Sequence, residues 1–227
     1  MSRSRDIADS TKTLDVDGGT IKLDGNYPVG TGNVALGDAA LDSNVSGGYN
    51  TAIGADALTA NTSSQNVAVG YQSLYTNTGN ANTAVGYQAL DANTSAEDNV
   101  AVGYSAAGSN TTGASNSILG SSALGSNTTG SFNTAIGRTA LFSNTTASNN
   151  TAVGYQASYS STETGGNTAV GYQSLYANTG SDNSAFGIRS LTDNTTGTKN
   201  TALGYDALTS NTTAAANTAV GYQALTT

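Results

Sequence analysis

Hydrophobic and polar positions follow one short pattern that recurs along most of the chain. The pattern reads Asn, then Thr, Val or Ser, then Ala, a large apolar residue and Gly, as in NTAVG at 82–86. Twelve copies follow one another at intervals of 16 or 17 residues, beginning at Asn33, Asn50, Asn66, Asn82, Asn99, Asn116, Asn133, Asn150, Asn167, Asn183, Asn200 and Asn217. A short fixed period indicates a solenoid, in which each repeat forms one coil stacked on the next.

Within one repeat, the residue types favour short strands and turns. Gly, Asn and Thr disfavour helix interiors. The copy at 82–98 predicts a strand at Thr83–Val85, a corner at Gly86, a second strand at Gln88–Leu90 and a return loop of variable length from Asn93. We therefore predict an all-β protein, a parallel β-roll or β-helix of twelve 16–17-residue coils. A two-sided coil is favoured over a three-sided one, whose turns usually run near multiples of six residues.

Period-two alternation assigns the two faces of the first strand. The large apolar residue, Val85 in this copy, is predicted to point into the coil together with the leucine of the second strand, Leu90. The preceding alanine then points outward, and a small apolar residue at one outward position favours the close approach of another chain. The predicted interchain face comprises Ala52, Ala68, Ala84, Ala101, Ala135, Ala152, Ala169, Ala185, Ala202 and Ala219. In the alternative reading, these alanines pack beneath a neighbouring turn of their own coil.

Asparagine and tyrosine also recur at fixed places. A second Asn, such as Asn93, opens the return loop, where its side chain is predicted to bond to its own turn or to stack on the Asn one coil away. The tyrosines that follow the corner glycine are predicted to form a row along one edge: Tyr71, Tyr87, Tyr104, Tyr155, Tyr172, Tyr205 and Tyr222. Such a row binds sugars, stiffens the edge by stacking, or packs against the next chain.

Residues 1–31 lie outside the repeat and are predicted to form an N-terminal anchor or cap beside the solenoid domain at 32–227. Residues 2–10 favour a short helix, and the segment TLDVDGGTIKLD at 13–24 favours a β-hairpin. As an anchor to a larger body, this element offers Arg3, Arg5 and Ile7 as candidate contacts. As a cap, it would cover the edge of the first coil.

Composition narrows the function classes. The chain has 7 Lys+Arg against 15 Asp+Glu, a net charge of −8, and neither His nor Cys. A Ser-His-Asp triad, a thiol nucleophile and the usual zinc ligands are therefore excluded, and we expect no enzyme activity, cofactor or metal site. The nearest candidates for paired carboxylates or weak calcium binding, Glu97, Asp98 and Glu163, fall in variable loops. Scattered cations argue against nucleic-acid binding, and no apolar run approaches the roughly 20 residues needed for membrane insertion.

The array NTAVGYQAL…NTTG…NTAVGYQAL over residues 33–227 resembles the repeats of bacteriophage tail fibres and related appendages. It is similar, more loosely, to the head repeats of trimeric autotransporter adhesins. These resemblances imply a β-roll or β-helix whose three chains assemble side by side as a homotrimer. The first ten residues lack the apolar segment of an export signal, which favours a virion protein assembled in the host cytoplasm.

The resulting expectation is a structural virion appendage, either a trimeric fibre or a surface spike. It would join another virion protein through residues 1–31 and contribute to host attachment by contacting a surface glycan or protein. The alternative is a bacterial surface adhesin or surface-layer solenoid on the extracellular surface. Ice binding is a third hypothesis. The paired threonines of the chain, such as Thr128 and Thr129, are expected in turns, whereas a flat ice-binding array needs threonines that alternate on one strand.

Overall fold

The computed structural model describes residues 14–16, 19–21, 31–44 and 46–226, and these residues form strands and turns with no helix. Near the N-terminus, β1 (Leu14–Val16) pairs antiparallel with β2 (Gly19–Ile21). This pairing confirms the hairpin predicted at 13–24. The helix expected at 2–10 and the candidate anchor residues Arg3, Arg5 and Ile7 lie outside the described residues.

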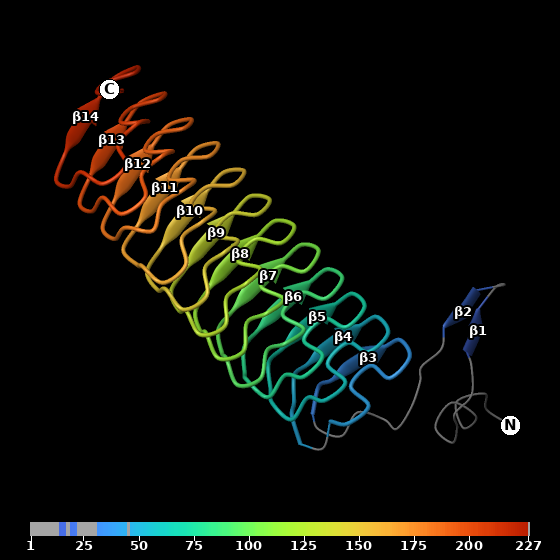
Figure 1. Ribbon diagram of the computed structural model, residues 1–227. Helices are drawn as coiled ribbons and strands as arrows, with labels where there is room; N and C mark the ends of the chain where they lie inside the picture. Colours follow the sequence, from blue (N-terminus) through green and yellow to red (C-terminus); the bar gives the residue numbers. More distant parts are fainter. Residues whose placement is uncertain (1–13, 17–18, 22–30, 45, 227) are drawn as a thin grey trace, which may run out of the picture.

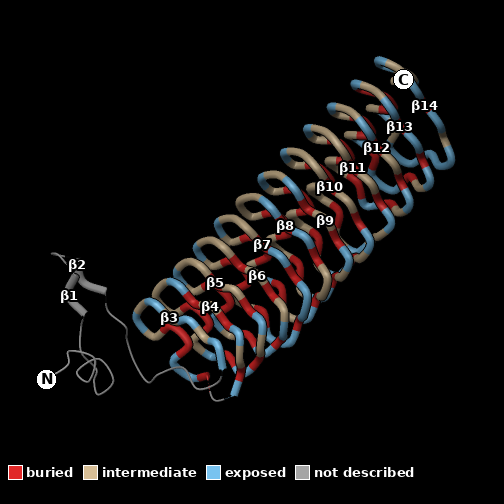
Figure 2. Tube along the Cα trace, turned by 180° about the vertical axis from the view of Figure 1, so that it is seen from behind, coloured by how far each residue is buried: buried red, intermediate tan, exposed pale blue. Residues whose placement is uncertain are grey.

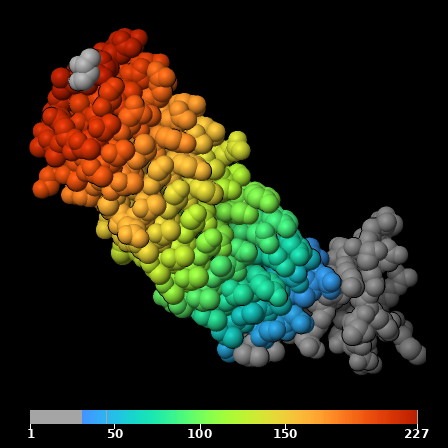
Figure 3. All heavy atoms as spheres, in the orientation of Figure 1, coloured from blue at the N-terminus to red at the C-terminus, as the bar shows by residue number. Residues whose placement is uncertain are grey.

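From residue 31 onward the chain winds into an elongated β-solenoid, which confirms the predicted fold (Figures 1 and 3). Neighbouring strands pair parallel and in register, so that each position of the repeat forms a column along the rod. The twelve strands are β3 (Val34–Leu36), β4 (Thr51–Ile53), β5 (Val67–Val69), β6 (Thr83–Val85), β7 (Val100–Val102), β8 (Ser117–Leu119), β9 (Thr134–Ile136), β10 (Thr151–Val153), β11 (Thr168–Val170), β12 (Ser184–Phe186), β13 (Thr201–Leu203) and β14 (Thr218–Val220).

The predicted second strand at Gln88–Leu90 is absent, and the segment is a turn. Gln88 and Leu90 have φ values of +52° each, in the left-handed region. This conformation lets two consecutive side chains, Ala89 and Leu90, both enter the core, where a strand would send one of them outward. The backbone still bonds between coils, because the Gln88 N–H donates to the Tyr71 carbonyl at 2.9 Å. Each coil is therefore one strand followed by an ordered turn segment.

The faces of the strand are the reverse of the prediction. The proposed interchain alanines, Ala52 through Ala219, are at most 4% exposed. The large apolar residue that follows each of them is half-buried or exposed and so faces outward. Figure 2 colours the buried stretches of the coils red. The leucines of the turn segment, such as Leu90, do point inward as predicted. They fill the narrow interior and leave room for little more than a methyl group opposite. Ile118 is the exception at the alanine position, and the leucine position of the preceding coil holds the small Ala107.

Two ladders of buried asparagines run along the core and confirm both predicted hydrogen-bonding roles. In the return-loop ladder, Asn93 Nδ2 donates to Asn77 Oδ1 at 2.6 Å and to the Ala96 carbonyl at 3.1 Å. In the ladder that precedes the strands, Asn99 donates through its backbone N–H to Asn82 Oδ1 at 3.0 Å. Buried polar groups are tolerated when they are bonded in this way. The ladders therefore fix the register of the coils.

The eighth coil interrupts the return-loop ladder. It has Ser158 where other coils have mostly leucine and Ser161 where they have asparagine. Two buried oxygens, Asn144 Oδ1 and Ser158 Oγ, have no hydrogen-bond partner among the described residues. An unsatisfied buried group costs stability. This coil is therefore the weak point of the core.

Restoring the ladder should stabilise the protein. In Ser161→Asn, the new amide is expected to donate to Asn144 Oδ1, as the corresponding asparagines of other coils donate to theirs. We expect the free energy of unfolding to rise by about 1 kcal/mol, measured by urea unfolding. Ser160→Asn, at the partly exposed neighbouring position, should change it little. Equal stability of Ser161→Asn and the wild type would contradict the idea of an unfilled gap.

Candidate functional site

The outer face of the twelve-stranded sheet runs along the rod and offers a surface that an interaction could use. We call the outward first and third residues of strands β3 to β14 the apolar strip. Its third-position residues are large and apolar in every coil. The more exposed of them range from 37% exposed at Ile53 to 66% exposed at Val220. Val, Thr or Ser occupies the first position, and no charged residue occurs at either position in a chain of net charge −8.

The first-position column is Thr or Ser in nine of the twelve coils, but the third-position column is apolar throughout. A continuous column of large apolar side chains is typical of a surface that another molecule covers. It replaces the predicted alanine face, whose members are buried in the core of the rod. The sequence held the relevant signal in the large apolar residue of each repeat. Alternation alone could not show which of two apolar positions faced outward.

The seven tyrosines after the corner glycines lie in one column and are exposed, but they do not form one continuous row. Their ring centroids are 5.2–5.5 Å apart within three stacks. The stacks comprise Tyr71, Tyr87 and Tyr104; Tyr155 and Tyr172; and Tyr205 and Tyr222. Stacking of this kind stiffens the edge of the rod.

Two arginines occupy this edge near breaks between the tyrosine stacks. The Arg138 guanidinium lies 5.9 Å from the centre of the Tyr155 ring and so extends that stack by a cation–π contact. Arg189 lies over Tyr205 at 5.3 Å and pairs with Asp206, whose Oδ2 is 2.6 Å from Nη2. The hydrogen bond to Asp206 raises the pKa of Arg189. Both arginines therefore interact with side chains of the neighbouring coil.

A second aromatic column, which the repeat pattern did not predict, follows the turn segment. Phe142 stacks on Tyr159 at 5.4 Å, and Tyr159 stacks on Tyr176 at 5.3 Å. Towards the N-terminus, this column is interrupted by Gly108 and Gly125. The interruption is a groove of about 260 Å³. Its signal in the sequence is the residue after the turn-segment leucine, which is aromatic in some repeats and glycine in two.

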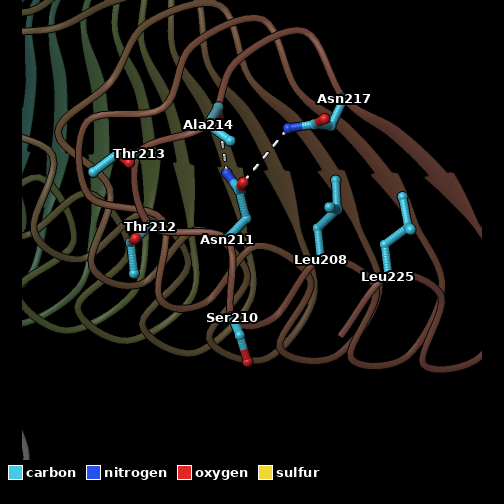
Figure 4. Close-up of a pocket in the computed structure, with 8 residues that line it drawn as sticks. All are labelled: Leu208, Ser210, Asn211, Thr212, Thr213, Ala214, Asn217 and Leu225. Atoms are coloured by element: carbon cyan, nitrogen blue, oxygen red, sulfur yellow. Dashed lines mark hydrogen bonds between the residues drawn. The ribbon is translucent and has the colours of Figure 1, made fainter. Parts of the chain in front are cut away.

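A larger hollow of about 310 Å³ lies at the C-terminal end of the rod (Figure 4). It opens over the return loop of the eleventh coil, on which the described residues stack no further return loop. Asn211 and Asn217 bond to each other there at 3.5 Å, and Asn211 also donates to the Ala214 carbonyl at 3.1 Å. The lining is uncharged and consists of hydroxyl, amide and apolar groups. We assign no ligand to this hollow.

The structure does not bring the three candidate carboxylates together. Glu97 and Asp98 lie in the return loop of the fourth coil, where Glu97 accepts a hydrogen bond from Asn80 at 2.8 Å, and Glu163 lies four coils away. Among the described residues, no group of three or more potential metal ligands occurs. In the same part of the chain, no helix has the length and apolar character to cross a membrane.

Fold and surface together define a parallel β-solenoid rod with one apolar side. Comparison with known proteins adds no relative, because no family model, curated protein or solved structure matches the chain.

Proposed function

We propose that this protein is a structural rod that assembles side by side with two further copies of itself through the apolar strip. The supporting observation is the strip itself, which is uncharged, recurs in every strand from β3 to β14, and has third-position residues that are half-buried or exposed. A partner that covers the whole strip must repeat with the same coil spacing, about 4.8 Å. A second copy of this chain meets that requirement in register, and cyclic symmetry would close such an assembly. The number of three copies follows from the resemblance to the repeat families that assemble as homotrimers.

The biological setting that we propose is a bacteriophage appendage, either a fibre or a surface spike. The proposal rests on the resemblance of the NTAVGYQAL repeats to those of phage tail fibres, and the rod shape is compatible with it. Attachment to another virion protein through residues 1–31 and contact with the host surface belong to the same proposal. A bacterial surface adhesin is the competing setting. Immunogold labelling would distinguish them by finding the protein on virions or on the cell envelope.

Charge placed in the strip should break the assembly. We expect the wild type to have a mass near three times 22.5 kDa by light scattering after size exclusion. The double variant Ile136→Glu/Val153→Glu should run as a monomer, because burying two adjacent carboxylates in an apolar interface is costly. Circular dichroism should be unchanged, since both side chains already face outward.

The matched control is Ser126→Glu/Ser143→Glu, which introduces the same charges in two adjacent coils outside the strip. It should remain trimeric. A monomeric wild type would overturn the assembly proposal. A dimer would retain the interface but exclude the trimer.

Ice binding is a second candidate for the same strip. The threonines anticipated in turns, Thr128 and Thr129, do lie outside the strands. Another set, including Thr134, Thr151 and Thr168, stands in register on the strands and alternates with the outward aliphatic residues, as a flat ice-binding array requires. The bulk of the aliphatic column favours a protein partner. Thermal hysteresis from a monomeric wild type would reverse that preference.

A further inference from the structure

Two rims flank the apolar strip along the rod. The leading rim is the residue before the first Asn of each repeat, such as Phe132 before β9. The trailing rim is the two residues after each corner glycine, such as Arg138 and Thr139 after β9. At the leading rim, every residue that carries a side chain has the same left-handed conformation, with φ between +56° and +64°. Equivalent rim residues therefore form columns, and their identity differs from coil to coil.

Cyclic assembly through the strip would bring the two rims together. When copies are related by an axis along the rod, all strands run the same way around that axis. The start of each strand then lies beside the end of a strand in the next copy. The leading rim of one copy thus faces the trailing rim of its neighbour at the same coil, whether two or three copies assemble. In an antiparallel pair, leading rims would face each other instead.

The charged residues of the two rims match in that arrangement. At the tenth coil, the leading rim carries the exposed Asp182 and the trailing rim carries the partly exposed Arg189. At the eleventh coil, the leading rim carries the exposed Lys199 and the trailing rim carries Asp206. Asp206 is nearly buried and already pairs with Arg189, so the long lysine side chain suits its recessed carboxylate. The two contacts between copies would extend this pair into a row of four alternating charges.

A shift by one coil in either direction turns these matches into repulsions. If each leading rim moves one coil towards the C-terminal end of its neighbour, Asp182 faces Asp206. In the opposite shift, Lys199 faces Arg189. In register, by contrast, no charged residue of one described rim faces a like charge on the other. Like charges placed opposite each other at an interface cost binding energy and so exclude the wrong arrangement.

The bulky residues of the leading rim favour the same register. Its two aromatic residues are Tyr49, which is 67% exposed, and Phe132, which is 63% exposed. In seven of the twelve coils the trailing rim begins with tyrosine, yet Tyr49 faces Ala55 and Phe132 faces Arg138. Ala55 leaves room for an aromatic ring. The guanidinium of Arg138 already lies over the Tyr155 ring and suits a second cation–π contact.

We propose that neighbouring copies of this chain bind each other rim to rim and in register, with Asp182 of one copy paired with Arg189 of the next and Phe132 stacked on Arg138. The inference rests on the assembly proposed above and adds what fixes its direction and register. The apolar strip cannot fix them alone, because its residues are similar in every coil and fit equally well after a shift. Complementary charges beside an apolar interface fix register in this way.

Cysteine cross-linking tests the register directly, because the chain contains no cysteine of its own. The double variant Phe132→Cys/Arg138→Cys should form a covalent trimer on a denaturing gel after mild oxidation, since each copy links to both neighbours. The two cysteines cannot link within one chain. The strand between them, β9, spans about 7 Å by itself, and a disulfide joins Cα atoms no more than about 7 Å apart.

The matched control is Phe132→Cys/Tyr172→Cys, in which the second cysteine lies two coils further along the trailing rim, about 10 Å away. It should assemble without forming a cross-link. A cross-link formed by Phe132→Cys alone would place leading rims opposite each other and overturn the proposal.

Light scattering on the same samples keeps this proposal and the assembly apart. A non-covalent trimer in which Phe132→Cys/Arg138→Cys does not link would refute the register alone. A covalent dimer would support the register and refute the third copy. A monomeric wild type would refute both.

An exchange of charges provides an independent test. Asp182→Lys/Lys199→Asp keeps the net charge and leaves opposite charges side by side on the leading rim. In register, the new lysine faces Arg189 and the new aspartate faces Asp206. We expect the protein concentration at which half of the assembly dissociates to rise at least tenfold at low salt, measured by light scattering over a dilution series.

Reversing the other two charges should undo this effect. When Arg189→Asp/Asp206→Arg is added to the exchange variant, every pair regains opposite charges, and the wild-type dissociation concentration should return. Circular dichroism checks that both variants are folded. A folded exchange variant that assembles as tightly as the wild type would contradict the proposal.

Discussion

Replacing the corner glycine Gly103 with alanine should lower the free energy of unfolding by at least about 4 kcal/mol. Gly103 has a φ of +141°, which side-chain-bearing residues rarely adopt. An added Cβ would also lie 2.6 Å from the carbonyl oxygen of Gly120 in the next coil. Because the obstacle is backbone, the coils must separate to relieve it. The measurement is the urea unfolding midpoint at a fixed protein concentration.

Two other glycines separate the causes of this effect. Gly221 has a φ of +132° at the corresponding corner of the last coil, but its nearest neighbour would be Ala224 Cβ at 3.9 Å. Gly221→Ala should therefore show the backbone strain alone, about 1–2 kcal/mol. Gly108→Ala, with neither strain nor a backbone clash, should be nearly neutral. Equal losses for Gly103→Ala and Gly221→Ala would refute the steric role of the stacked coil.

Removing one rung of the asparagine ladder should be the second most damaging change. Asn99 Oδ1 accepts hydrogen bonds from the Asn116 backbone N–H at 2.9 Å and from its side-chain amide at 3.1 Å. Asn99 Nδ2 donates to the Gly113 carbonyl at 2.9 Å. In Asn99→Ala, these buried partners lose their bonds. We expect a loss of about 3 kcal/mol, because each unsatisfied buried group costs about 1–3 kcal/mol.

The control for the ladder is Asn80→Ala. Asn80 is exposed; its amide donates to the exposed Glu97, and its Oδ1 accepts from the backbone N–H of the half-buried Ser64 at 3.0 Å. Because water can replace both bonds, its loss should cost less than about 1 kcal/mol. Hydrogen exchange offers an independent measurement. In Asn99→Ala, the backbone amide of Asn116 should lose protection while amides several coils away keep theirs. Full protection at Asn116 would show that water replaces the lost side chain.

Much of the fold was predictable because the same residue pattern, under the same physical constraints, occurs twelve times. The strand at Thr83–Val85, the corner at Gly86 and the hydrogen-bonding roles of Asn93 were all predicted and are present. Each depends on local chemistry or on a neighbour one period away. A fixed period places equivalent residues side by side without any knowledge of the rest of the coil.

The orientation of the strand was not predictable, because both of its faces carry apolar residues. Ala84 and Val85 alternate, and either could face the core by hydrophobicity alone. The turn segment decides between them. Ala89 and Leu90 both enter the interior through left-handed backbone conformations that alternation rules do not anticipate. Their volume leaves space for alanine and directs the larger residue outward.

The sequence by itself therefore determined that this protein is a stacked β-solenoid with asparagine ladders, glycine corners and no catalytic side chains of the His or Cys type. Tertiary structure alone decided which surface is apolar and which residues line the groove. The reason is physical. Facing depends on how the whole cross-section of a coil is filled, and the groove extends from Asp91 to Phe142, which lie three coils apart in the stack.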